Sequence, residues 1–174
     1  GFDAQMLGAA MLSIVILLVR FVLQQFDLLV ERISIEQKFR KFANTDTLTE
    51  IGNRRAIMAE LHEMIEREEC FALALLDLDG FKQINDRLGH ATGDRVLQEV
   101  AKRLTHAVEP GDSVGRLGGD EFVAIFRNIS DKSDASQRAT AILAHLCRPL
   151  NTGEHKVPVG ASLGYAHFPD DAAD

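Results

Sequence analysis

The sequence has few cysteines, and none of them has a metal-binding spacing. Cys70 and Cys147 are far apart in the chain and the six histidines are scattered, which argues against a structural zinc site or a redox motif. Each cysteine lies within an apolar pattern, where a free thiol packs as a small hydrophobic group. We therefore predict that both cysteines are reduced and lie in the core.

Positive charge is also scarce. The 19 lysines and arginines are outnumbered by 26 aspartates and glutamates, and the formal net charge is −7. This balance argues against nucleic acid as a partner, although a local basic cluster can still bind one phosphate. Internal repeats and low-complexity segments are absent too. A chain of 174 residues with 46% hydrophobic content is therefore expected to form one globular domain plus an additional segment.

The first 23 residues contain a long apolar run. Met6–Val19 carries no charge, and residues 21–23 extend the run beyond Arg20. Because a helix needs about 20 mostly apolar residues to cross a membrane, we predict a transmembrane helix over residues 1–23. A buried core helix or a dimer-forming helix is the alternative. Basic residues follow the run, which predicts an inner-membrane protein whose remaining chain faces the cytoplasm. The chain begins on Gly1 rather than Met, which suggests a piece of a longer protein.

Residues 24–44 have helical periodicity and are expected to form a signalling linker. An apolar stripe with the spacing of a coiled coil runs along this segment, but Arg32 interrupts it. Two interpretations of this segment are therefore possible: a coiled coil, or a single amphipathic helix that lies against the following domain. The stripe consists of Leu28, Ile35, Phe39 and Phe42.

From Thr45 the chain changes to a compact α/β pattern. Apolar residues at helical spacing predict helices, and short apolar or alternating runs predict strands. Gly118 and Gly119 suit the tight turn of a hairpin. The order of elements predicts an α/β (α+β) domain over residues 45–174. The helical stripes are Ile57–Ile65, Val96–Leu104 and Ala139–Leu146, the second in a helix that starts near Gly93; the strands are expected within 71–76, 113–126 and 156–168.

Acidic residues lie where buried strands end. Asp77 directly follows an apolar strand, and a desolvated carboxylate must be paired, hydrogen-bonded or bound to a metal. Asp79 has a simpler explanation as a helix N-cap before Gly80. The adjacent Asp120 and Glu121 point to opposite faces of an extended strand, so only one of them meets Asp77 easily. Two acidic sites on adjoining strands predict a Mg²⁺–phosphate site, because Mg²⁺ binds one or two carboxylates and completes its shell with water and phosphates.

Groups that suit phosphates and bases lie nearby in the sequence. A helix that starts at Gly80-Phe81-Lys82 offers backbone N–H groups and a lysine to a polyphosphate. Arg116 adds a second positive charge. Asn85 and Asp94 carry polar groups that suit a base edge, but roles as a turn residue and an N-cap explain them equally well.

Two other motifs share parts of this pattern. An EF-hand loop is excluded because the glycine of residues 77–80 comes too early and no bidentate Glu closes the loop. Residues 73–81 are also similar to the first motif of haloacid-dehalogenase-type phosphatases, in which the first Asp is the nucleophile and the second a general acid. Those enzymes usually have Thr where this chain has Phe81. This alternative also leaves the turn at residues 118–122 without a role.

Blocks of sequence in a fixed order closely resemble the GGDEF family of diguanylate cyclases. The resemblance implies a nucleotidyl-cyclase-like palm, in which helices flank a central and mostly antiparallel sheet. It also implies that two GTP molecules, one on each of two facing domains of a homodimer, are joined into cyclic di-GMP with release of two pyrophosphates. The blocks are residues 46–55, 77–86, 89–94, 116–122 and 162–164.

The resemblance further implies a role for each residue of the site. Asp77, Asp120 and the Leu78 carbonyl are expected to bind Mg²⁺, or Mn²⁺ in its place. Asp120 is expected to help deprotonate the attacking 3′-hydroxyl, and Glu121 to assist at the metal or the ribose. These tasks agree with the charge neutralisation and positioning that phosphoryl transfer requires. By the same resemblance Asn85 and Asp94 are expected to hold the guanine. Lys82 and Arg116 are expected to contact phosphates, and Lys82 is also expected to be catalytic. The substrate site is completed by Phe81, His90 and Gly119.

Two departures from the family pattern bear on function. The family's inhibitory product site uses Arg-x-x-Asp, of which Asp112 is present while Glu109 replaces the arginine. An acid there repels a phosphate, so we expect no product inhibition. Residues 45–174 also contain no match to the family's last helix, whose basic residues contact the triphosphate, so the C-terminal part of the domain is expected to be missing. A catalytically weak GTP-binding or regulatory module is therefore the alternative to an active cyclase.

Overall fold

The structure is a computed structural model that describes residues 2–151 and 156–171. Within its helices and strands, the side chains of residues 2–10, 12–16, 36–41 and 151 are not described. The chain divides into two compact units, Gly1–Lys41 and Phe42–Asp174.

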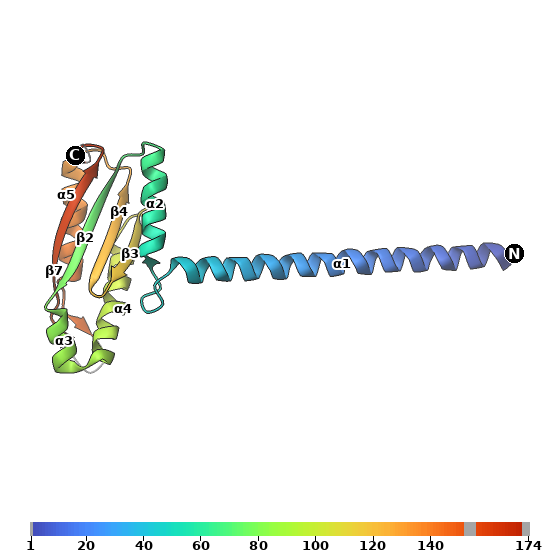
Figure 1. The fold of residues 1–174 in the computed structure, drawn as a ribbon, viewed down its shortest axis with the longest axis horizontal. Helices are drawn as coiled ribbons and strands as arrows, with labels where there is room; N and C mark the ends of the chain where they lie inside the picture. Colours follow the sequence, from blue (N-terminus) through green and yellow to red (C-terminus); the bar gives the residue numbers. More distant parts are fainter. Residues whose placement is uncertain (1, 152–155, 172–174) are drawn as a thin grey trace. The chain divides into compact units, whose positions relative to one another are not determined.

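A single helix, α1 (Phe2–Asn44), accounts for the first unit (Figure 1). Residues 24–44 lie within this helix, and their role as a signalling linker stays a prediction. Among the side chains that the structure describes, no helix offers a stretch that is long and apolar enough to cross a membrane. The predicted transmembrane helix is therefore not supported, and most of its apolar run, Met6–Val19, lies outside the described side chains.

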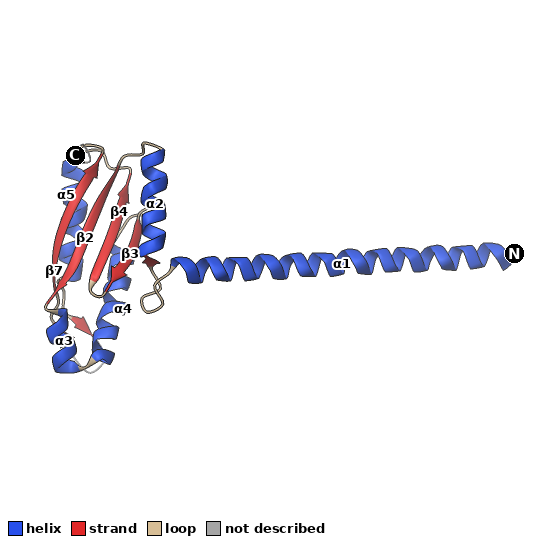
Figure 2. Ribbon diagram, in the orientation of Figure 1, coloured by secondary structure: helices blue, strands red, loops and turns tan. Residues whose placement is uncertain are grey.

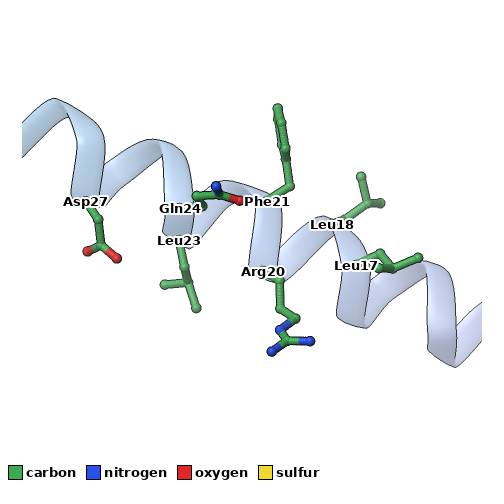
Figure 3. A pocket seen from close by; sticks show the side chains of 7 residues that line it. All are labelled: Leu17, Leu18, Arg20, Phe21, Leu23, Gln24 and Asp27. Carbon is green, nitrogen blue, oxygen red and sulfur yellow. The ribbon is translucent and has the colours of Figure 1, made fainter.

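Apolar side chains lie on more than one side of the middle of α1. Figure 3 shows Leu18 and Phe21 leaving the helix on one side, whereas Arg20 and Leu23 leave it on the other. Each of the three apolar side chains is more than half exposed. The described side chains do not decide between the coiled coil and the amphipathic helix, and both stay predictions.

The second unit is built on a five-stranded sheet in the strand order β1-β3-β4-β2-β7 (Figure 2). β1 runs parallel to β3, and the other neighbours are antiparallel, which confirms the predicted mostly antiparallel sheet. β5 and β6 pair in a separate two-stranded sheet. The strands are β1 (Gly52–Asn53), β2 (Phe71–Asp79), β3 (Ser113–Gly118), β4 (Glu121–Arg127), β5 (Leu150–Asn151), β6 (Lys156–Val157) and β7 (Gly160–Phe168).

The two faces of the main sheet are covered differently. On one face, α4 and α5 pack on the larger core, which contains Leu76 and Phe122. On the other face, α2 packs through Ile57 on Val123 and the neighbouring strand β3. β2 is only partly covered on this second face, because Leu75 is 49% exposed there. The helices are α2 (Arg54–Glu66), α3 (Phe81–Leu88), α4 (His90–Ala107) and α5 (Lys132–Leu146).

Both cysteines contradict the prediction that they lie in the core. Cys70 and Cys147 are free, and both are exposed. Cys70 lies in the loop before β2, and Cys147 is the C-cap residue of α5. An apolar pattern in the neighbouring sequence therefore does not bury a residue that lies just outside the element.

The structure also changes two predicted element boundaries. β2 continues to Asp79, so Asp77 lies within the strand rather than after it. Asp79 is not the N-cap of α3, because Gly80 holds that position with φ of 69° and no side-chain cap bond. Asp79 Oδ1 instead accepts a hydrogen bond from Ser162 Oγ at 2.8 Å, which joins the end of β2 to β7. α4 begins at His90, earlier than the predicted start near residue 93.

Candidate active site

Three strands place polar side chains in one row on the partly open face of the sheet. Asp77 of β2 is the direct partner of Glu121 on β4 and of Ser162 on β7. Directly opposed residues of antiparallel strands point to the same face, with their Cβ atoms about 5 Å apart. All three residues line a cavity of about 410 Å³, and Arg54 lines it with them. Two carboxylates therefore share one accessible hollow.

The turn between β3 and β4 places Asp120 beside β2. Gly118 and Gly119 have φ of 147° and 54°, a backbone region that favours glycine. The N–H of Leu78 donates to the Asp120 carbonyl at 3.3 Å, so the turn and the end of β2 are in contact. Of the two neighbouring acids, Glu121 is the one that lies opposite Asp77 across the ladder. The predicted roles of Asp120 and of the Leu78 carbonyl as metal ligands stay predictions.

The oxygen donors here fit Mg²⁺ or Mn²⁺ in company with a phosphate. Within residues 2–151 and 156–171, no described group of three or more His, Cys, Asp or Glu could hold a metal ion. Mg²⁺ does not need such a group, because it is bound by one or two carboxylates with waters and substrate phosphates. Like charges directly opposite each other destabilise a sheet, so Asp77 and Glu121 favour a cation between or beside them.

Arg116 holds the turn rather than pointing at the carboxylate row. Its Nη1 donates to Asp46 Oδ1 at 3.1 Å, and its Nε and Nη2 donate to the Gly119 carbonyl at 2.9 and 2.8 Å. Arg116 pairs with Phe122, whose side chain lies in the core under α4 and α5. Arg116 therefore lies on the sheet face opposite to Glu121. A contact with a phosphate, as predicted from the sequence, would require breaking these bonds.

Asp46 owes its low pKa to the partners that surround it. Burial alone raises the pKa of this carboxyl, but hydrogen bonds from the Thr49 hydroxyl and N–H and from Arg116 outweigh burial, so the net pKa lies below its ordinary value. The Thr49 bonds measure 2.7 and 2.9 Å. Asp46 is therefore ionised at neutral pH and forms an ion pair with Arg116.

The residues predicted to hold guanine lie on the neighbouring helices α3 and α4. A Cβ added at Gly93 would lie 1.9 Å from Asn85 Oδ1 and 3.3 Å from Phe81 Cζ. The absence of a side chain at Gly93 therefore lets Asn85 approach the turn of α4 that carries Asp94. Phe81 is partly buried and packs against the larger core.

Lys82 and His90 are exposed side chains, on α3 and α4 respectively. Exposure is compatible with the predicted contacts to substrate, and those contacts stay predictions. The structure thus brings Asp77, Glu121 and the Asp120 turn together, and it brings Asn85 to the helix of Asp94.

A protein-family model described as diguanylate cyclase, GGDEF domain, matches residues 43–174. This match covers most of the chain and includes every residue of the site described above. The chain belongs to the GGDEF family.

Named relatives agree with this assignment. The bifunctional diguanylate cyclase/cyclic di-GMP phosphodiesterase MucR of Pseudomonas aeruginosa is 37% identical over 130 residues, which cover 72% of this chain and 19% of MucR. Diguanylate cyclase DgcN of Escherichia coli is 38% identical over 126 residues, 70% of this chain and 31% of DgcN. The chain thus spans about a third or less of these relatives.

A solved structure has the same fold. The coiled coil and GGDEF domain of DgcB from Caulobacter crescentus, in complex with c-di-GMP, superimposes with a TM-score of 0.70 at 32% identity. The match covers 86% of this chain and 82% of that structure. The GGDEF fold expected from the sequence blocks is therefore confirmed, and the phosphatase alternative is not favoured.

Glu109, which stands where the family's inhibitory site has arginine, forms an internal ion pair in this GGDEF domain. Arg138 of α5 contacts Glu109 at 3.2 Å and Asp112 at 3.4 Å. The Asp112 side chain is 3% exposed and also accepts a hydrogen bond from the Arg127 N–H at 2.8 Å. Both carboxylates are thus engaged by protein groups. The expected lack of product inhibition stays a prediction.

Arg54 is a residue of this GGDEF site to which the sequence pattern assigned no role. It is the first residue of α2, directly after Asn53, whose side chain caps the helix by accepting from the Ala56 N–H at 3.0 Å. The Asn53 amide also donates to the Ala43 and Thr45 carbonyls, which fixes the start of α2. The spacing of residues 46–55 does not reveal that this helix begins beside the carboxylate row.

Proposed function

We propose that this GGDEF domain is a diguanylate cyclase, which joins two GTP molecules into cyclic di-GMP and releases two pyrophosphates. The observation that carries the proposal is the direct pairing of Asp77 with Glu121 on an accessible face, beside the turn that holds Asp120. Phosphoryl-type transfer depends mainly on metal-assisted charge neutralisation and positioning, and this arrangement suits both. Relatives named as diguanylate cyclases support the same activity.

In this proposal the metal would be held by Asp77 and by the turn that carries Asp120, and Asp120 accepts one proton. Asp77, Asp120 and the Leu78 carbonyl would hold Mg²⁺, which would supply charge neutralisation at the phosphates. Asp120 accepts the proton of a 3′-hydroxyl, whose oxygen forms a bond to the α-phosphorus of the other GTP. The bond between that phosphorus and pyrophosphate breaks in the same exchange. Glu121 assists at the metal or the ribose from its place opposite Asp77.

The helices α3 and α4 hold the nucleotide in the same proposal. Asn85 and Asp94 bind the guanine edge, and Asn85 lies close to Gly93, the residue before Asp94 in α4. Lys82 and the backbone N–H groups at the start of α3 contact phosphates, since the N-terminus of a helix favours anions.

Two copies of the domain must meet, because one domain carries one such row and the product has two phosphodiester bonds. The DgcB structure, which contains a coiled coil with its GGDEF domain, supports a homodimer in which α1 pairs two copies. An inner-membrane location with the domain in the cytoplasm is a further proposal, and its support is the apolar run of residues 6–19 alone.

The decisive experiment is product formation from GTP and Mg²⁺ by the chain at high protein concentration, measured by chromatography. We expect cyclic di-GMP from the wild type, and Asp77→Asn to reduce its rate by about a hundredfold or more. Glu68→Gln, which removes an exposed carboxylate in the loop after α2, is the control and should retain the rate. GTP binding without any cyclic product would exclude the cyclase and favour the regulatory module.

A further inference from the structure

Arg54 reaches the carboxylate row from α2. Its Nη2 lies 3.9 Å from Glu121 Oε2, and its Nε donates to the Leu117 carbonyl at 3.2 Å. The residue lines the same hollow as Asp77, Glu121 and Ser162. A guanidinium is thus present on the face where the two opposed carboxylates lie.

The pair between Arg54 and Glu121 contributes little to the fold. The two side chains are 65% and 56% exposed, and their distance is at the limit for an ion pair. Exposed pairs of this kind stabilise a protein by roughly 0–1 kcal/mol. The bond from Nε to Leu117 orients the guanidinium, and the terminal nitrogens remain accessible to an anion.

Arg54 also lies on a different face from the arginine that the sequence suggested as a phosphate ligand. Val123 and Ile125 face α2, so the alternating residue Glu121 does so as well. Arg116 lies on the other face and is 13% exposed, with Asp46 and Gly119 as its partners. Of these two arginines, Arg54 alone shares the face and the hollow of Asp77 and Glu121.

A row of carboxylates that receives a triphosphate needs a cation in addition to the metal. Asp77 and Glu121 bring two carboxylates to the hollow, the turn that carries Asp120 lies beside β2, and GTP brings further negative charge. Arginine binds phosphate oxygens through two parallel N–H bonds, which a lysine cannot do. The accessible fork of Arg54, next to Glu121, has the chemistry and the position for this contact.

We propose that Arg54 is a substrate-binding residue that contacts the polyphosphate of the nucleotide and exchanges its contact with Glu121 for a phosphate oxygen. The inference rests on the proposed function for the identity of the substrate. It does not depend on turnover, because it concerns binding of a polyphosphate by the hollow between β2, β4 and α2.

The test measures binding of GTP, inorganic tripolyphosphate and guanosine to the full chain by calorimetry with Mg²⁺. Arg54→Gln should weaken GTP and tripolyphosphate about tenfold and leave any guanosine affinity unchanged. Arg54→Lys, which keeps the charge without the fork, should lose about threefold. Arg55→Gln removes the next arginine, which does not line the hollow, and should stay within about twofold of the wild type.

Activity provides a second readout, in which Arg54→Gln should raise KM more than it lowers kcat. Thermal unfolding of Arg54→Gln should match the wild type, because the ion pair is exposed. Equal affinity of Arg54→Gln and wild type for tripolyphosphate would overturn the inference, as would a wild type that binds no polyphosphate. Tight polyphosphate binding by a wild type that forms no cyclic di-GMP would sink the cyclase proposal and leave the role of Arg54 supported.

Discussion

The contact between Arg116 and Asp46 is expected to stabilise the turn that carries Asp120. Arg116 donates one hydrogen bond to Asp46 and two to the Gly119 carbonyl. Because the arginine and aspartate side chains are only 13% and 23% exposed, solvent screens them less than a surface pair. Hydrogen bonds to charged groups contribute roughly 1.5–3 kcal/mol each, and water replaces Arg116 at the exposed Gly119 carbonyl. We therefore expect Arg116→Ala to lower the free energy of unfolding by about 2–3 kcal/mol.

A double-mutant cycle separates this pair from its surroundings. Asp46→Ala also removes the bonds from Thr49, so it should cost about 3 kcal/mol. The double variant should cost less than the sum of the single variants by about 1–2 kcal/mol. Arg67, the C-cap residue of α2, and Glu63, four residues earlier in α2, provide the control pair, because their side chains are 62% and 59% exposed. Their coupling energy should stay below about 0.5 kcal/mol.

Urea unfolding of the full chain measures both cycles. The chain has one tyrosine and no tryptophan. Tyr165 lies on β7, so its fluorescence reports on the second unit and not on α1. A coupling energy between Asp46 and Arg116 no larger than that of the control pair would refute the reasoning that Arg116 holds the turn.

Three further changes test other contacts. Gly93→Ala should weaken GTP binding about tenfold, because the new Cβ displaces the flexible Asn85 side chain, while urea unfolding changes by less than about 1 kcal/mol. Gly115→Ala should cost about 1–3 kcal/mol in urea unfolding without a specific loss of GTP affinity, since its Cβ would lie 2.4 Å from Ile57 Cγ1 and 2.9 Å from a backbone oxygen. The lowered pKa of Asp46 stabilises the fold above the ordinary aspartate pKa of 3.8, so the stability difference between wild type and Asp46→Asn should be constant near neutral pH and shrink as pH falls below that value. A difference that grows on acidification would contradict the assignment.

The sequence predicts the sheet well because local patterns and the register agree. The apolar run at residues 71–76 lies within β2, and the glycine pair of the predicted hairpin lies at the β3–β4 turn. The strand ends are less predictable. β2 continues through Asp77 and Asp79 because β7 pairs with it along its full length, and that pairing joins residues far apart in the chain. The same limitation explains the exposed cysteines, since exposure depends on where an element stops.

Register also decides which charged residues can act together. Alternation along a strand predicts that Asp120 and Glu121 differ, but a shift of one residue in pairing would exchange their faces. The pairing of Asp77 with Glu121 removes this ambiguity and sends Arg116, the partner of Phe122, to the other face. Arg54 reaches the carboxylate face only because α2 packs there, which no spacing near the signature reveals. Two arginines near one motif thus have different tasks: Arg116 holds the turn, and Arg54 lies on the face where the inferred substrate phosphates would bind.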